Sequence, residues 1–123
     1  MNQRGIRKVS VGERKQGQPT PGMTRPEAIV VDDIWSGTAV TEPGAVSDWH
    51  HHGAHDTIVY VARGAFDVET AEGVVRASAG DFVHVPAHVI HREGNSSDTS
   101  AEVVLVRRGS GPVVVNVDGP DAG

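Results

Sequence analysis

Residues 57–85 read TIVYVARGAFDVETAEGVVRASAGDFVHV, and this stretch decides the fold. It contains short runs of β-branched and other apolar residues, and each run is followed by residues that favour a turn. The runs are Thr57 to Val61, Ala65 to Thr70, Val74 to Ala77 and Asp81 to Val85, separated by Arg63-Gly64, Glu72-Gly73 and Ala79-Gly80. None of them keeps the apolar period of an amphipathic helix, so the stretch predicts a succession of short β-strands.

The same pattern continues on both sides of this stretch. Similar runs are Ala28 to Val31, Ser36 to Thr41, Glu102 to Val106 and Val113 to Val117. Many short, evenly spaced strands without a helical pattern predict an all-β sandwich or barrel. A chain of 123 residues has room for one such domain.

The N-terminal part of the chain has a different composition. Residues 1–28 carry six Lys or Arg and two Glu, whereas the rest carries five basic and fourteen acidic residues. We therefore expect a basic arm at residues 1–27, a β-domain at 28–118 and a short tail at 119–123. The alternation from Ile6 to Val11 is compatible with one edge strand that is exchanged between subunits.

Composition also excludes several classes of function. The basic arm lacks interleaved aromatic residues and the acidic body would repel phosphates, which argues against nucleic-acid binding. No segment approaches the roughly 20 apolar residues of a membrane span, and the N-terminus lacks the apolar core of a signal peptide, so we expect a cytoplasmic protein. The chain has no cysteine, so any metal site must be built from histidine and carboxylate ligands.

Histidines are concentrated in one part of the chain. All seven lie between His50 and His91, and four of them lie within residues 50–55. A group this dense in a cysteine-free chain favours one divalent transition metal, among Fe, Mn, Zn, Ni, Co and Cu. A solvated loop is the alternative, but the run is internal and leads directly into the apolar strand that begins at Thr57.

Alternation along a strand selects the candidate ligands within this group. His50 and His52 point to the same face and His51 to the other, so we expect His51 to lie outside the site. His91 is the natural third ligand because it follows a second apolar segment, Phe82 to Ile90. Three imidazoles leave coordination positions open, as catalytic metal sites do.

Two spaced motifs resemble those of the cupin superfamily. The first has Gly44, five residues, His50-x-His52, four residues, position 57, six residues and Gly64. The second has Gly80, five residues, Pro86, then His91 and Asn95. The spacing fits both family motifs from Gly44 to Asn95, and the ending Asn116 to Pro120 resembles small, single-domain bacterial cupins.

The sequence departs from the family pattern at two positions. Thr57 stands where the pattern has a glutamate ligand, so the carboxylate is expected to be missing. The resemblance then implies a site of His50, His52 and His91, with His55 as the first candidate for a fourth ligand and Asp56 as a weaker one. The alternative role for His55 is an acid-base group beside the metal. His88 replaces the glycine of the second motif, in a turn that accepts another residue if its φ is negative.

The resemblance implies a double-stranded β-helix, or jelly roll, that holds its metal inside the barrel near one end. We expect an enzyme acting on a small oxygenated organic molecule, in the manner of an iron- or manganese-dependent dioxygenase. The alternatives are an isomerase or lyase without redox chemistry, and a barrel that binds or senses a sugar or carboxylate without catalysis. Cupin barrels often pair through their N-terminal strands, so we also expect a homodimer.

Overall fold

The computed structural model describes residues 5–17 and 20–121, and its regular structure is almost entirely β. One short 3₁₀ helix, η1 (Val11–Glu13), lies in the arm. The strands are β1 (Met23–Thr24), β2 (Glu27–Val31), β3 (Ile34–Thr41), β4 (His50–His51), β5 (Asp56–Arg63), β6 (Ala65–Thr70), β7 (Gly73–Ser78), β8 (Phe82–Val85), β9 (Arg92–Gly94), β10 (Ala101–Arg108) and β11 (Val115–Asn116). Each predicted run overlaps one of these strands.

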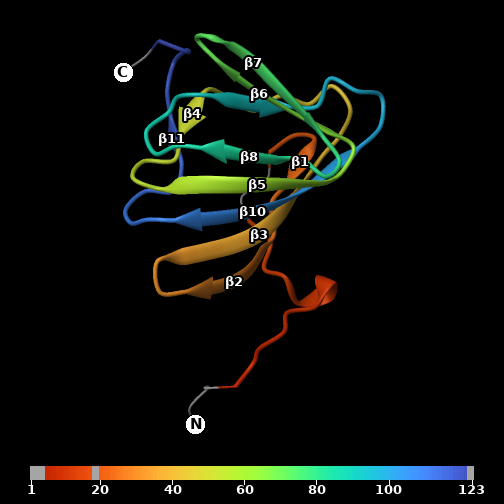
Figure 1. The fold of residues 1–123 in the computed structure, drawn as a ribbon, viewed down its shortest axis with the longest axis vertical. Coiled ribbons are helices and arrows are strands. Elements are labelled where there is room, and N and C mark those ends of the chain that lie inside the picture. Colours follow the sequence, from red (N-terminus) through yellow and green to blue (C-terminus); the bar gives the residue numbers. More distant parts are fainter. Residues whose placement is uncertain (1–4, 18–19, 122–123) are drawn as a thin grey trace.

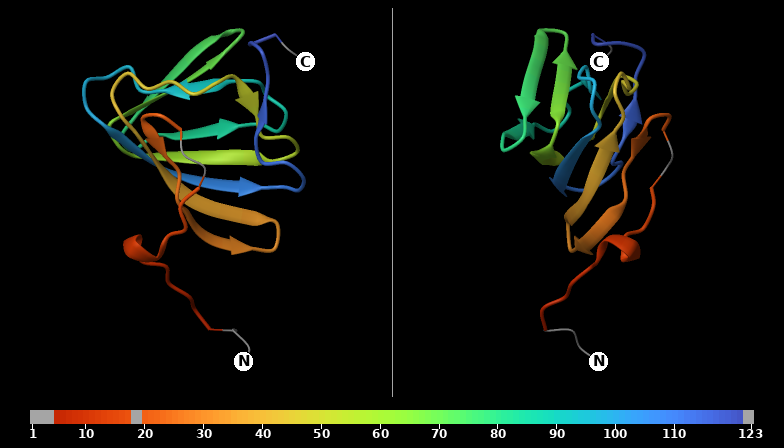
Figure 2. Two further views of the ribbon diagram at one scale, coloured as in Figure 1. Left: turned by 180° about the vertical axis from the view of Figure 1, so that it is seen from behind. Right: turned by 90° about the vertical axis from the view of Figure 1, so that its right-hand side faces the viewer.

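The strands form a double-stranded β-helix, which confirms the predicted fold class. A larger sheet has the order β1-β3-β10-β5-β8, with β2 also paired to β3. A second sheet has the order β7-β6-β9, and β4 pairs with β11. Figure 1 shows the larger sheet below β6 and β7, and the right-hand view of Figure 2 separates the β6–β7 hairpin from the β2–β3 hairpin. Single bridges between His50 and His91 and between Val46 and Gly94 join the β4 region to β9.

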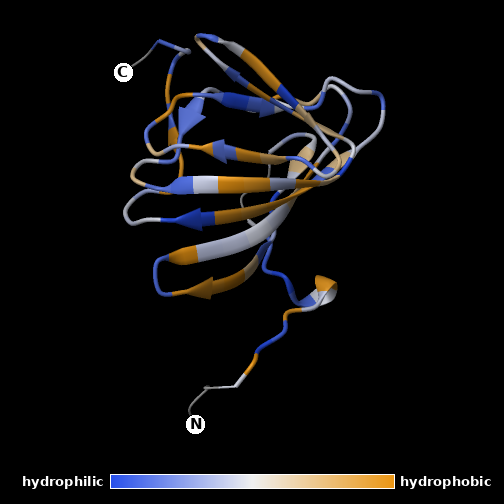
Figure 3. Ribbon diagram, in the orientation of Figure 1, coloured by the Kyte–Doolittle hydropathy of each residue, from blue (hydrophilic) through white to orange (hydrophobic). Residues whose placement is uncertain are grey.

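The core lies on the inner face of the larger sheet. Strand β10 is central, because it pairs along its length with both β3 and β5, and it sets Leu105 opposite Val59. Buried residues alternate with more exposed ones along β5 and β10, and Figure 3 shows that both strands are largely apolar. The buried apolar cluster consists of Ala39, Val59, Val61, Phe66, Val68, Ala77, Val103 and Leu105. The face predicted for Thr57, Val59 and Val61 is therefore the inner one, while Tyr60 lies on the outer face against Phe82.

One turn differs from expectation. His88 has a φ of 66°, so it keeps the left-handed conformation of the glycine that it replaces, and the expected negative φ is wrong. Its backbone N–H donates to the carbonyl of Gly53 over 2.9 Å. This contact fixes the turn between β8 and β9 against the loop that follows β4, which gives a physical reason for retaining a conformation costly for a non-glycine residue.

The end of the arm joins the domain. Residues Lys15 and Glu27 form a bridge, and β1 pairs with β3. Met23 is buried in the interior, and Arg25 reaches the site described below. In the ranges 5–17 and 20–121 there is no helix with the length and apolar character needed to cross a membrane.

Candidate metal centre

Four side chains converge at one end of the barrel and could hold a metal ion. They are His50, His52, His91 and Glu93, and their candidate ligand atoms all lie within 4.8 Å of one another. We refer to these residues as the His/Glu cluster. The rings of the three histidines have centroids 4.5 to 5.1 Å apart. The three histidines are buried, with exposed fractions of 4% or less.

Two antiparallel segments bring the cluster together. His50 begins β4, and His52 follows two residues later on the same side of the chain, as the alternation predicts. His91 forms a two-way backbone bridge with His50, over 2.8 and 2.9 Å, just before β9 begins. Glu93 lies two residues beyond His91 on β9, so the same alternation returns it to the cluster.

Backbone carbonyls fix the tautomer of each imidazole in the cluster. The Nδ1 atoms lie 2.7 Å from the carbonyl of Asp48 for His50, 2.7 Å from that of Val113 for His52, and 3.0 Å from that of Val89 for His91. A carbonyl only accepts hydrogen bonds, so each Nδ1 carries the proton and donates it. Each Nε2 is then left with a lone pair facing the cluster, which is the arrangement of a metal-binding histidine.

Glu93 is the carboxylate of the cluster. Its Oε2 lies 3.2 Å from Nε2 of His91 and 3.8 Å from Nε2 of His50, while its Oε1 lies 3.3 Å from a guanidinium nitrogen of Arg25. Arg25 thus holds one oxygen of Glu93, and the other oxygen faces the imidazoles. Two ligands about 2.1 Å from a common ion, at angles of about 90° to 110°, lie about 3.0 to 3.4 Å apart, so these separations are close to those of a metal site.

The protonation states of His50, His52 and Glu93 suit a metal. Burial lowers the pKa of His50, and burial together with the nearby Arg107 lowers that of His52 to about 3, so both are neutral at neutral pH. Burial would raise the pKa of Glu93, but its contact with His91 and the surrounding positive charges outweigh burial and lower it, so the carboxylate is ionised. Burial opposes protonation of His91, but the same contact raises its pKa.

An unsatisfied atom provides an independent test of whether a metal fits. Nε2 of His91 is buried without a hydrogen-bond partner, because with the proton on Nδ1 it carries a lone pair, and Oε2 of Glu93, 3.2 Å away, is also an acceptor. Buried polar atoms normally have a partner. A cation between the four side chains would accept this lone pair and face the carboxylate, so the residues present fit a divalent metal.

The predicted ligands divide into two groups. The structure brings His50, His52 and His91 together, but His55, the candidate for a fourth position, is not part of the cluster. His55 is buried, with its Nδ1 3.0 Å from the carbonyl of His52. Asp56 is exposed, 2.9 Å from His84, which lowers the pKa of its carboxyl through a hydrogen bond.

We expected a site without a carboxylate ligand, and this expectation is wrong, because Glu93 belongs to the cluster. The family position, Thr57, does lack one, and its Oγ1 is buried without a partner. The carboxylate comes instead from the second motif region, at the second residue after His91. A His-x-Glu pair in an extended segment carries the same signal as His50 and His52, so the sequence offered a way to find Glu93.

His51 lies outside the cluster and accepts a hydrogen bond from the backbone N–H of Gly53 over 2.9 Å.

The cluster lies between an open pocket and a small interior space. The pocket has a volume of about 530 Å³ and is lined in part by Arg25, His50, His52, Glu93 and Arg107. The interior space, about 10 Å³, lies beneath the cluster among core residues and has room for about one water molecule. Among the residues that the structure describes, the pocket therefore gives a small organic molecule a route to the cluster, whereas the interior space is too small to hold one.

Comparisons with known proteins agree with this architecture. Protein SchB of Streptomyces halstedii is 29% identical over 92 residues, which cover 75% of this chain and 67% of SchB. The structure of KdgF from Halomonas sp. matches with a TM-score of 0.72 and 27% identity, over 86% of this chain and 96% of KdgF. The polyketide cyclase RemF from Streptomyces resistomycificus matches with a TM-score of 0.77 and 16% identity, over 96% of this chain and 89% of RemF, which shows a shared fold.

The family model described as "Cupin domain" matches residues 37–107, a range that includes His50, His52, His91 and Glu93. This range covers more than half of the chain and contains both spaced motifs. The chain belongs to the cupin family.

Proposed function

We propose that this protein is a divalent-metal-dependent enzyme that acts on a small oxygenated organic molecule. One observation carries the proposal: three imidazoles and one carboxylate converge, with Nδ1 of each imidazole donating to a backbone carbonyl, and His50, His52 and Glu93 line an open pocket of about 530 Å³. Four protein ligands leave positions free on an ion that prefers five or six, as in catalytic rather than closed structural sites. We propose iron or manganese as the metal.

The chain's own residues have separate parts in this proposal. The Nε2 atoms of the three imidazoles and Oε2 of Glu93 would hold the metal. When bound, the metal would supply Lewis acidity toward an oxygenated substrate and, if it is iron, the capacity to react with dioxygen. The contact with His91 and the charges of the imidazoles, together with Arg25, lower the pKa of Glu93 and keep it ionised, and Arg25 holds its other oxygen. The small interior space beneath the cluster leaves the substrate the pocket side.

For the reaction we propose oxidation by dioxygen. The open positions of the metal support this reaction, since substrate and oxygen both need access to the ion. They also suit an isomerase or lyase, and a binding barrel would use the same positions to orient its ligand. These three functions differ in whether they consume oxygen and in whether they turn a substrate over.

Metal analysis followed by turnover assays tests the proposal. The protein is purified without a histidine tag and its metal content measured by mass spectrometry, together with His50→Ala and, as a matched control, His51→Ala. Oxygen uptake is then followed with a panel of diketones, thiols and phenols, in parallel with product analysis under argon. We expect about one metal per chain in the parent protein and in the His51 variant, loss of metal in the His50 variant, and substrate-dependent oxygen uptake.

The other outcomes contradict defined parts of the proposal. Turnover under argon would replace the dioxygenase by an isomerase or lyase. Stoichiometric metal with ligand binding but no turnover would replace the enzyme by a binding protein. A parent protein without metal would refute the metal site itself.

A further inference from the structure

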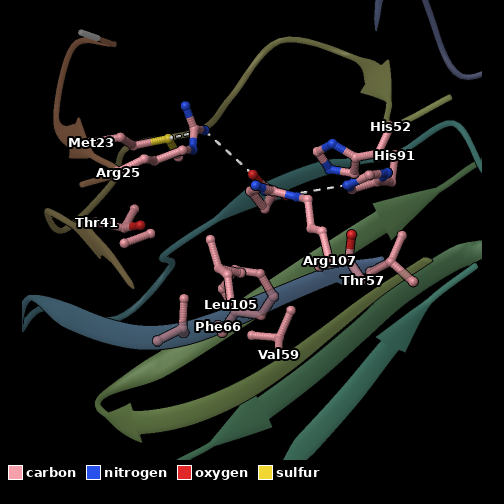
Figure 4. A pocket seen from close by; sticks show the side chains of 14 residues that line it. Met23, Arg25, Thr41, His52, Thr57, Val59, Phe66, His91, Leu105 and Arg107 are labelled. Carbon is pink, nitrogen blue, oxygen red and sulfur yellow. Dashed lines mark hydrogen bonds and ion pairs between the residues drawn. The ribbon is translucent and has the colours of Figure 1, made fainter. Parts of the chain in front are cut away.

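Arg107 lies on the inner wall of the barrel beside the His/Glu cluster. It is on β10, and the strand register sets it opposite Trp35 on β3 and Thr57 on β5. Only 5% of the residue is exposed, and Cζ of its guanidinium lies 4.8 Å from the centre of the Trp35 ring. The side chain lines both the open pocket and the interior space, and Figure 4 shows it extending from the wall toward the level of His52 and His91.

The charge of Arg107 has no partner. Among the residues that the structure describes, no carboxylate forms an ion pair with it, and its buried Nε has no hydrogen-bond partner. Glu93 is a nearby acid, but its Oε1 is taken by Arg25 and its Oε2 faces the imidazoles. A buried, unpaired cation is costly, and an anionic ligand bound beside it would offset that cost.

Thr57 explains why this charge is free. A glutamate at this position, as in the cupin pattern, would lie directly across the strand pair from Arg107 and could neutralise it. The neutral threonine leaves the guanidinium unpaired and also brings a buried hydroxyl without a partner. Two unsatisfied polar groups therefore face each other across neighbouring strands, beside the candidate metal site.

We propose that Arg107 forms an anion subsite at the pocket, where its guanidinium receives a carboxylate of the substrate while a neighbouring oxygen of the same molecule approaches the cluster. This inference rests on the proposed function and narrows its substrate class to small oxygenated acids. The planar guanidinium matches a carboxylate with two parallel hydrogen bonds, and its stacking on Trp35 holds that plane in place.

Calorimetric titration with a pair of probes tests the subsite. Pyruvate carries a carboxylate next to a carbonyl, and pyruvamide is its neutral counterpart of nearly the same shape. Both are titrated into the zinc-loaded parent protein and into Arg107→Met, which keeps the length of the side chain but removes the charge. Arg108→Met is the matched control, because Arg108 is the next residue on β10, exposed and 3.3 Å from Asp33.

We expect the Arg107 variant to bind pyruvate about tenfold or more weakly while its affinity for pyruvamide changes by less than about threefold. The Arg108 variant should match the parent protein with both probes. Pyruvate binding by the Arg107 variant within about twofold of the parent value would overturn the subsite, as would a parent protein that binds no pyruvate. Arg107→Gln, a second variant without charge, has the same expected results if the methionine variant does not fold.

The design separates this inference from the proposed function. Metal content is measured on every variant, and binding of pyruvate requires no turnover. If the parent protein takes up no metal, the proposed function fails, and the subsite is judged by the same variants in metal-free protein. If metal is bound in full but the Arg107 substitution leaves pyruvate binding unchanged, only the subsite fails.

Discussion

Replacing Glu93 by glutamine should weaken metal binding while leaving the fold in place. Unit charges about 4 Å apart interact by about 4 kcal/mol at an effective dielectric constant of about 20, and a divalent ion doubles this value. Water and the amide oxygen of the new glutamine would replace much of the lost interaction energy between the carboxylate and the ion. We therefore expect a net cost of about 3 kcal/mol, or roughly a hundredfold weaker metal binding. Arg25 also loses its ion pair, in which the two side chains are 25% and 13% exposed, so the metal-free variant should be less stable by about 1 to 2 kcal/mol.

Competition with a chromophoric chelator gives the metal affinity of Glu93→Gln, and thermal unfolding of the metal-free protein gives its stability. Glu69→Gln is the matched control, because Glu69 also pairs with an arginine, 2.7 Å from Arg92, but at a half-exposed position outside the cluster. The control should bind metal like the parent protein. A folded Glu93 variant with parental metal affinity would refute Glu93 as a ligand and leave three histidines as the site.

Three further predictions concern the cluster, the interior and the assembly. Alanine in place of any of the three histidines of the cluster should abolish metal binding, measured by mass spectrometry after dialysis. His55→Ala should retain the metal. Loss of metal from the His55 variant would show that His55 is a ligand. Thr57→Val removes a buried hydroxyl without a partner and should leave the melting temperature of the metal-free protein unchanged or raise it, by up to about 1 kcal/mol in stability. A clear drop in melting temperature would show that the hydroxyl has a partner in solution. Sedimentation velocity should show a homodimer, and a monomer at all concentrations would contradict it.

The fold was predictable because its signal is local and repeated. Runs of β-branched residues that end at Gly-containing turns specify the strands, and the alternation in β5 places Thr57, Val59 and Val61 on the inner face. Short strands such as β1 and β9 carry too little of this pattern to be recognised. They exist because β1 pairs with β3 and because β6 holds β9, and these contacts are distant in sequence.

The site could be predicted where the alternation of side chains along an extended strand was used. Applied to His50 and His52 it gave two neighbouring imidazoles, but a carboxylate was sought only near position 57, where the family has it, with Asp56 as the candidate. The same rule applied after His91 would have selected Glu93. Arg107 carried no such signal, because an arginine near the end of an apolar strand is most often exposed, and only the register with Trp35 and Thr57 shows that it faces inward.

The hydrogen bond from His52 to the carbonyl of Val113 spans 61 residues and has a consequence for how the pocket can change during evolution. Every residue type offers the same backbone carbonyl, so substitution at position 113 need not disturb the tautomer of the imidazole. The neighbouring side chains of Val114 and Asn116 line the pocket. The C-terminal segment can therefore vary in sequence to suit different small molecules, while its backbone continues to present the same histidine to the metal.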